Sequence, residues 1–312
     1  MSNAEQSHGA HECVACGAAT WEAFFEARDL TGAVDGTFTY IRCGGCGLIR
    51  LEPLPSAGEA ASFYPHDYAG YRIGGNRLAG AVQDLLYRRS ARWIERHGAP
   101  SQARRVLEIG CAAGKFLRVL RRLGWDAVGL EPSKQAAEVG RRVFGLDIRC
   151  GTLKPDLFDR GEFDCVVLRH AIEHVAEPAA MLDEIARTLK PGGLLFIVTP
   201  NTSSLDRAIF GRYWHDYDVP RHVFVYSATN LALLLQRHGF GLVAIRHSIV
   251  PNNYIGSVER LCRGQARLRR AAGFFRFQNP LTWPLFMPFA ALGALIRRSG
   301  RIEMLARAPC LR

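Results

Sequence analysis

The chain of 312 residues lacks any apolar run of the roughly 20 residues that a membrane-spanning helix requires. The longest candidate, residues 281–296, has 16 residues and is interrupted by Pro284 and Pro288. The first residues are polar and contain no apolar core segment, so no secretory signal peptide is predicted. We therefore expect a cytoplasmic protein, with peripheral attachment to the inner face of a membrane as an open alternative.

Lysine is also scarce. It occurs only at Lys115, Lys134, Lys154 and Lys190, so arginine supplies nearly all of the 40 basic residues and the formal net charge of +11. This balance favours anionic partners such as phosphates, nucleic acid or a membrane surface. Part of the excess lies in residues 260–300, where arginines alternate with aromatic and apolar residues. That mixture suits peripheral membrane contact or an apolar substrate. A cap that packs on its own domain is the alternative.

The dinucleotide-binding pattern Gly-x-Gly-x-x-Gly is absent as well. Instead, a predicted strand at 105–109 leads through Gly110, Ala112 and Gly114 into a helix. Small residues keep side chains away from such a turn and allow a ligand to approach the backbone. A second strand, at 126–131, ends in an acid placed to bind the two hydroxyls of a ribose. The chain therefore has the pattern of a protein that binds a nucleoside-containing cofactor.

The acid before the turn, Glu108, distinguishes between two such cofactors. A carboxylate there would repel the pyrophosphate of a dinucleotide. S-adenosylmethionine has no phosphate, and its positively charged ammonium suits Glu108. The residues therefore favour S-adenosylmethionine.

Three later motifs extend this interpretation: "HAIEHV" at 170–175, "LKPGGLLFIVTPN" at 189–201 and "VPRHVFVYS" at 219–227. With them, residues 100–250 resemble the class I S-adenosylmethionine-dependent methyltransferases, within the bacterial group that modifies small molecules and glycans. The resemblance implies a doubly wound, Rossmann-like α/β sheet of seven strands. Strands alternating with helices support the same fold class.

The predicted cofactor contacts lie at strand ends and in the turn. Backbone groups of Thr152 and Leu153 are expected near the adenine, and Arg169 and His170 near the methionine part. The complete set is Glu108, Gly110, Cys111, Ala112, Gly114, Glu131, Pro132, Thr152, Leu153, Arg169 and His170.

A methyl acceptor that carries a hydroxyl needs a base, and histidine is suited to that role near neutral pH. We expect His222 to be this base, with His174 as the second candidate; a purely structural role for His222 is the alternative. A second metal site is left open, formed by His222 with His170, Glu173 and His174; the i, i+3 and i+4 spacing of these three places them on one face of a helix start. Trp214 to Tyr217 are candidates for contacts with a sugar or ring.

Four of the nine cysteines form two Cys-x-x-Cys-Gly pairs, at Cys13 and Cys16 and at Cys43 and Cys46. Reduced thiols in this spacing are typical of a structural zinc ribbon, in which four thiolates hold one Zn²⁺. A redox pair or unrelated thiols are the alternatives.

The predicted organisation has three parts: a zinc ribbon at 1–55, an aromatic linker and helix at 56–100, and a class I methyltransferase domain at 101–312 with a cap inserted at about 250–300. The predicted function is methyl transfer to a small molecule or glycan, including lipid-linked and nucleotide sugars. The alternatives are an RNA methyltransferase, with nucleic acid the less favoured partner, and a catalytically inactive zinc-ribbon binding module.

Overall fold

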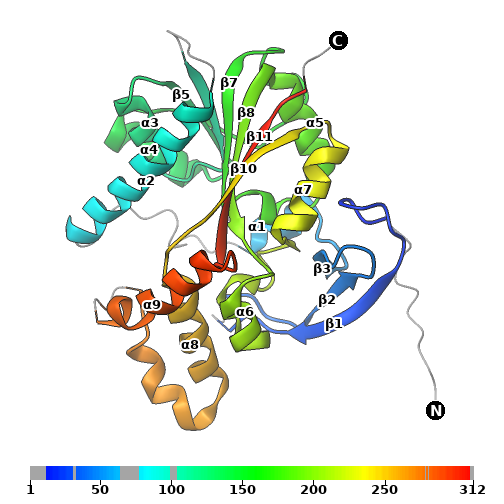
Figure 1. The fold of residues 1–312 in the computed structure, drawn as a ribbon, viewed down its shortest axis with the longest axis vertical. Helices are drawn as coiled ribbons and strands as arrows, with labels where there is room; N and C mark the ends of the chain where they lie inside the picture. Colours follow the sequence, from blue (N-terminus) through cyan, green and yellow to red (C-terminus); the bar gives the residue numbers. More distant parts are fainter. Residues whose placement is uncertain are drawn as a thin grey trace.

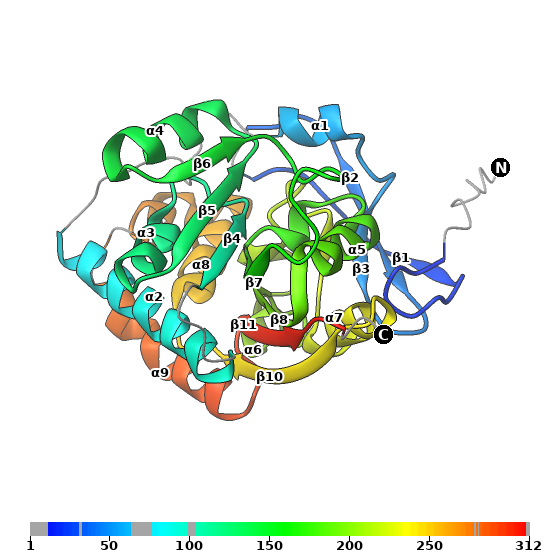
Figure 2. The same cartoon turned by 90° about the horizontal axis from the view of Figure 1, so that it is seen from above.

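The computed structural model describes residues 12–30, 33–63, 77–98, 104–277, 279 and 281–309. Its centre is a seven-stranded sheet with the strand order β10-β11-β8-β7-β4-β5-β6 (Figures 1 and 2). Strands β4 to β8 are parallel, whereas β11 is antiparallel to both β8 and β10. The strands are β4 (Arg105–Ile109), β5 (Asp126–Glu131), β6 (Asp147–Cys150), β7 (Phe163–Arg169), β8 (Leu189–Pro200), β10 (Gly241–His247) and β11 (Arg301–Arg307). The predicted doubly wound sheet of seven strands is confirmed.

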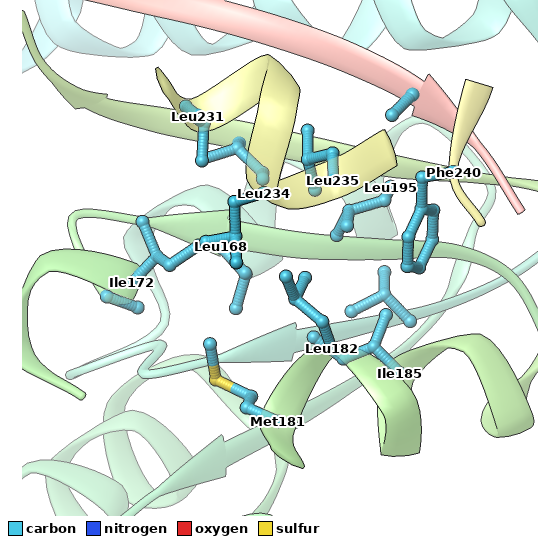
Figure 3. Packing of buried hydrophobic residues seen from close by; sticks show 14 of the residues in the cluster. Leu168, Ile172, Met181, Leu182, Ile185, Leu195, Leu231, Leu234, Leu235 and Phe240 are labelled. Carbon is cyan, nitrogen blue, oxygen red and sulfur yellow. The ribbon is translucent and has the colours of Figure 1, made fainter. Parts of the chain in front are cut away.

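Helices cover both faces of this sheet. On one face lie α2 (Arg77–His97), α3 (Lys115–Arg122) and α4 (Lys134–Phe144), and on the other lie α5 (Pro178–Thr188) and α7 (Ala228–Arg237) (Figure 2). Figure 3 shows how leucine and isoleucine side chains of α5 and α7 pack against β7 and β8. Full burial of one such side chain contributes roughly 1.5–3 kcal/mol, so packing of α5 and α7 on this face stabilises the sheet.

Residues 190–193 form an irregular part of β8. The pairing of β7 with β8 begins at Phe163 and Leu189 and then shifts, so that Cys165 pairs with Leu194. Gly192 takes up the extra length with a φ of 73°. The strand therefore begins at Leu189, before the irregular segment.

The N-terminal part contributes a second sheet with the order β1-β2-β3-β9. Its first three strands are β1 (Trp21–Ala27), β2 (Phe38–Cys43) and β3 (Ile49–Glu52). The fourth, β9 (Phe224–Val225), belongs to the main domain and pairs antiparallel with β3. A short helix, α1 (Ala57–Ser62), follows; most of the predicted aromatic linker lies outside the described residues.

A group of helices lies beyond the carboxyl edge of the main sheet, below it in Figure 1. It contains α6 (Leu205–Phe210), α8 (Asn252–Gly264) and α9 (Thr282–Leu295). Short 3-10 helices complete the elements: η2 (Ile172–His174), η3 (Gly211–Tyr213), η4 (His215–Tyr217) and η5 (Ala266–Gly273). Among the helices that are described, none is long and apolar enough to cross a membrane.

Candidate active site

The turn between β4 and α3 lies at the carboxyl edge of the sheet. Gly110, Ala112 and Gly114 have positive φ angles of 70°, 48° and 73°. A Cβ at Gly114 would lie 2.5 Å from the side chain of Leu146, so this position requires glycine for space as well as for conformation. The turn therefore presents backbone rather than side chains toward the edge.

Glu131, the last residue of β5, ties this turn to the neighbouring strand. Its carboxylate accepts hydrogen bonds from the amides of Ala112 and Ser133, each at 2.8 Å. Burial raises the pKa of Glu131, and the two amide bonds oppose that rise. Because each carboxylate oxygen has more than one acceptor site, the group can still accept hydrogen bonds from a ligand.

Glu108 and Arg169 lie at the ends of the adjacent strands β4 and β7. Glu108 Oε2 and Arg169 Nη1 are buried and have no hydrogen-bond partner among the described residues. Burial raises the pKa of Glu108 to about 8, although Arg169 opposes that rise. The Arg169 guanidinium lies over the rings of Tyr87 and Phe116, 4.7 and 4.6 Å from their centroids. A buried acid and a half-buried cation, each with one buried atom that lacks a partner, fit a ligand that carries both an ammonium and a carboxylate.

The other predicted cofactor residues lie at the same edge. Cys111 is buried in the turn, and Pro132 is exposed directly after Glu131. Thr152 is exposed and Leu153 half-buried in the segment that follows β6. The carboxyl ends of β4, β5 and β6 thus bring these residues along one side of the sheet.

The two histidines expected to act as bases meet face to edge. The ring centroids of His174 and His222 are 4.7 Å apart. Nδ1 of His174 lies 2.9 Å from the carbonyl oxygen of Arg221, and Nδ1 of His222 lies 2.6 Å from that of Asp216. A carbonyl oxygen only accepts, so each Nδ1 carries the hydrogen and each Nε2 carries a lone pair. Burial and the neighbouring His174 lower the pKa of His222 to about 4.

Glu173 is fully buried behind this pair. Its carboxylate accepts a hydrogen bond from Thr199 Oγ1 at 3.0 Å and lies 3.1 Å from His170 Nδ1. Burial raises the pKa of Glu173, but the hydrogen bond with His170 and the nearby histidines outweigh it and lower the pKa to about 2. The carboxylate is therefore ionised at neutral pH and stabilises positive charge on the imidazoles.

One ligand atom from each of Glu173, His174 and His222 lies within 4.8 Å of the others, a spacing compatible with one metal ion. The sequence suggested that His170 would share a helical face with Glu173 and His174. Instead, His170 precedes the 3-10 turn and has a φ of 52°, and its ring turns to Glu173. His170 is therefore outside the compact group.

The interpretation of Trp214 and Tyr217 as contacts for a sugar or ring is wrong. Trp214 is fully buried and donates a hydrogen bond from Nε1 to Asp206 at 2.6 Å. Tyr217 is 2% exposed and packs in the same hydrophobic cluster as Trp214. Both are core residues of the loop that carries His222, because the N-terminal strands cover that loop.

Two residues on which this loop depends, Tyr40 and Arg221, were not predicted. Tyr40 belongs to β2 and donates from its hydroxyl to the carbonyl oxygen of His222 at 2.6 Å. Arg221 forms a buried ion pair with Asp29. Nothing in a linear sequence relates residues almost two hundred positions apart.

The four cysteines of the two Cys-x-x-Cys-Gly pairs converge in space. Sγ of Cys13 lies 3.6 Å from Sγ of Cys46, and the same distance separates Cys16 from Cys43. All four sulfur atoms are within 4.8 Å of one another. Four thiolates at about 2.3 Å from a tetrahedral zinc ion would be separated by about 3.8 Å. The sulfur positions therefore fit one Zn²⁺.

Comparison with known proteins adds two findings. A sequence model described as a methyltransferase domain matches residues 80–245. A ubiquinone biosynthesis O-methyltransferase of Rhodopseudomonas palustris (strain HaA2) is 32% identical over 153 residues, covering 46% of this chain and 60% of the relative. Another protein of that name, from Bradyrhizobium diazoefficiens, is 30% identical over 188 residues, covering 54% of this chain and 73% of the relative.

A solved structure gives the same fold. A chain in the complex between the Haloferax volcanii Trm112 methyltransferase activator and the putative methyltransferase aligns with a TM-score of 0.50 and 18% identity. The alignment covers 75% of this chain and 95% of that one.

The first of the two sequence relatives is matched over only three fifths of its length, so its activity does not transfer directly.

The geometry of the four cysteines generates one prediction. We expect elemental analysis to find about one zinc per chain, and Cys43→Ser to lower that content because a hydroxyl is a poor zinc ligand. Cys150→Ser, at an exposed cysteine outside the cluster, should leave the zinc content unchanged. A fully folded protein without metal, or equal zinc in both variants, would contradict the assignment.

Proposed function

The chain belongs to the methyltransferase domain family and has the class I fold, and from that premise we propose that it transfers a methyl group from S-adenosylmethionine to a hydroxyl of a small molecule or glycan. The observation that carries the proposal is the buried group of His222, His174 and Glu173, next to a turn suited to the cofactor. The names of the curated relatives favour oxygen as the acceptor atom.

The cofactor would be held by charge and hydrogen bonds from this chain. Glu131 would accept hydrogen bonds from the ribose hydroxyls, and backbone groups at Thr152 and Leu153 would contact the adenine. Glu108 would bind the ammonium of the methionine part and Arg169 its carboxylate, which would satisfy the two buried atoms that lack partners. When bound, the cofactor supplies an electrophilic methyl group on a sulfonium.

His222 would act as the base. The acceptor hydroxyl loses its proton as it attacks, and Nε2 of His222 carries the lone pair to receive it. The low pKa of His222 keeps the imidazole neutral at pH 7, so it is ready to accept a proton. The ionised Glu173 would stabilise the imidazolium that forms. In-line alignment of the hydroxyl supplies the rest of the rate enhancement.

A metal-assisted variant of the same reaction is the second candidate. The spacing of Glu173, His174 and His222 suits one divalent ion. Bound there, an ion would act as a Lewis acid and lower the pKa of the acceptor hydroxyl. A chelator would then abolish turnover without removing the four-cysteine zinc, and adding back divalent ions would restore it.

The surface of the cap points to an anionic membrane as a partner. Among the described residues, ten of the twenty exposed large apolar side chains lie between Leu268 and Ile296, with Leu281 at 68% and Leu295 at 80% exposure. Residues 260–302 contain nine arginines and no acidic residue. Arg260 and Arg263 are paired with acids, which leaves the remaining arginines of this segment. Exposed apolar side chains and arginines within one segment suit the interface of a bilayer with acidic lipids. We propose that the cap rests on such a bilayer, which would give access to a lipid-linked acceptor.

Cofactor binding should release a proton. With a pKa of about 8, Glu108 is mostly protonated at pH 7 in the free protein, and an ammonium would displace that proton. Affinity should therefore rise as the pH increases from 6 to 8. Calorimetry in two buffers of different ionisation enthalpy measures the release. Glu108→Gln should abolish it, whereas Glu138→Gln, on the exposed side of α4, should not. Preference for a nicotinamide dinucleotide would refute the cofactor assignment.

Replacing the base should slow the chemistry and spare the cofactor. His222→Asn is expected to lower kcat by about 10²–10⁴, the usual contribution of general base catalysis, with cofactor affinity nearly unchanged. His238→Asn, at a surface histidine bonded to Asp183, is the control. In the unaltered enzyme, kcat should fall only as the pH drops toward 4, because protonation of His222 removes the base. Full turnover by His222→Asn would move the role to His174.

Membrane contact can be measured by sedimentation with vesicles. The protein should bind vesicles that contain phosphatidylglycerol more tightly than pure phosphatidylcholine vesicles, and high salt should weaken the binding. Leu281→Asp and Leu295→Asp should each reduce partitioning about tenfold or more, since each buried leucine contributes roughly 1.5–3 kcal/mol. Val143→Asp changes a residue on α4 that is 51% exposed and lies outside the cap, and it should have no effect. Equal binding by all variants, or preference for RNA, would overturn the proposal.

A further inference from the structure

The N-terminal ribbon, defined here as residues 12–30 and 33–52, contacts the main domain beside His222. Its last strand, β3, pairs with β9, which begins two residues after His222. The amide of Leu51 donates a hydrogen bond to the carbonyl oxygen of Val223 at 2.8 Å. The ribbon therefore packs directly against the segment that carries His222 and is not an independent domain.

Three successive carbonyl groups show how closely the two parts are connected. The Arg221 carbonyl accepts from His174, the His222 carbonyl accepts from the Tyr40 hydroxyl at 2.6 Å, and the Val223 carbonyl accepts from the ribbon backbone. The amide of Val223 in turn donates to the carbonyl of Glu173 at 2.8 Å. A single short segment thus receives bonds from the ribbon and from the residues around the histidine pair.

A buried ion pair reinforces this connection. Arg221 Nη1 lies 3.1 Å from Asp29 Oδ2, and both side chains are at most 3% exposed. The same guanidinium binds Asp218, four residues before His222, at 2.9 Å. Ionic hydrogen bonds in such a buried place are strong and fix orientation, while loss of one partner is costly. Asp29 therefore fixes the side chain of the residue that adjoins His222.

Packing completes the contact. Tyr40, Ile49 and Leu51 of the ribbon form one hydrophobic cluster with Trp214, Tyr217 and Val219 of the loop. The rings of Phe25 and Tyr217 are 4.6 Å apart. The loop buries its large side chains against the ribbon, which explains why they are unavailable to a substrate.

We propose that the ribbon is a positioning module for the site: Tyr40 and Asp29 hold the loop of residues 216–222 so that His222 stays against His174 and Glu173. Tyr40 and Asp29 are then positioning residues that act through His222 and Arg221. This inference rests on the proposed role of His222.

The test separates positioning from general stability. Tyr40→Phe removes the hydrogen bond to the His222 carbonyl and keeps the ring. Asp29→Asn keeps the shape and weakens the ion pair. Tyr254→Phe is the matched control, because it removes another buried hydroxyl, one that bonds the carbonyl of Phe289 in α9. Each variant is measured for zinc content, S-adenosylhomocysteine affinity, the imidazole NMR signals of His174 and His222, and, with the acceptor, kcat and KM.

We expect Tyr40→Phe and Asp29→Asn to retain one zinc and to bind S-adenosylhomocysteine within about twofold of the unaltered protein. The imidazole signals of His222, assigned with His222→Asn, should shift or broaden, and kcat should fall about tenfold or more with little change in KM. Tyr254→Phe should alter none of these. Should Tyr40→Phe fail to fold, Asp29→Asn gives the same readouts.

Unchanged imidazole signals and kcat in both ribbon variants would overturn the inference. A uniform loss of zinc, cofactor affinity and stability would also overturn it, since it would indicate a structural role only. If the imidazole signals move while His222→Asn retains full turnover, the positioning stands and the proposed role of His222 fails. The failure of each proposal is therefore recognisable separately.

Discussion

The pairing of β3 with β9 is the constraint on which the arrangement of the site depends. Strand pairing fixes the backbone of residues 223–225 relative to the ribbon, and the preceding residues then have little freedom. The carbonyl of Arg221 consequently accepts a hydrogen bond from His174, and the carbonyl of His222 accepts one from Tyr40. The sheet of the ribbon and the loop of the main domain form one structural unit.

Burial at the carboxyl edge produces opposite charge states in two acids of the same type. Glu108 has one oxygen without a partner, and burial raises its pKa to about 8 although Arg169 opposes the rise. Glu173 is equally inaccessible, but hydrogen bonds and imidazoles lower its pKa to about 2. The difference comes from partners rather than from depth. One acid is thus suited to receive a cation, and the other already balances the charge of its surroundings.

The cap and the ribbon extend the minimal fold in different ways. The ribbon buries its aromatic side chains against the loop that follows β8, so its apolar surface is already used. The cap leaves leucine and phenylalanine side chains exposed among arginines. The two additions therefore differ in their consequences. The ribbon restricts the loop that carries His222, whereas the cap presents an exposed apolar surface to solvent.

The sequence alone determined the sheet, the turn and the cysteine group, because each rests on a local pattern. Strand periodicity, the small residues at 110, 112 and 114, and each Cys-x-x-Cys-Gly motif are patterns that span only a few residues each. The sequence indicated only roughly that His174 and His222 would meet, because both residues follow strands whose carboxyl ends lie at one edge of the sheet. The tertiary structure decided the rest. The partners Tyr40 and Asp29 and the burial of Trp214 and Tyr217 depend on contacts between distant segments. His170 and Glu173 are only three positions apart, but their contact depends on a φ of 52° at His170, which the residue spacing does not reveal. No local pattern encodes the contacts between the ribbon and the main domain, because the residues that make them lie far apart in the sequence.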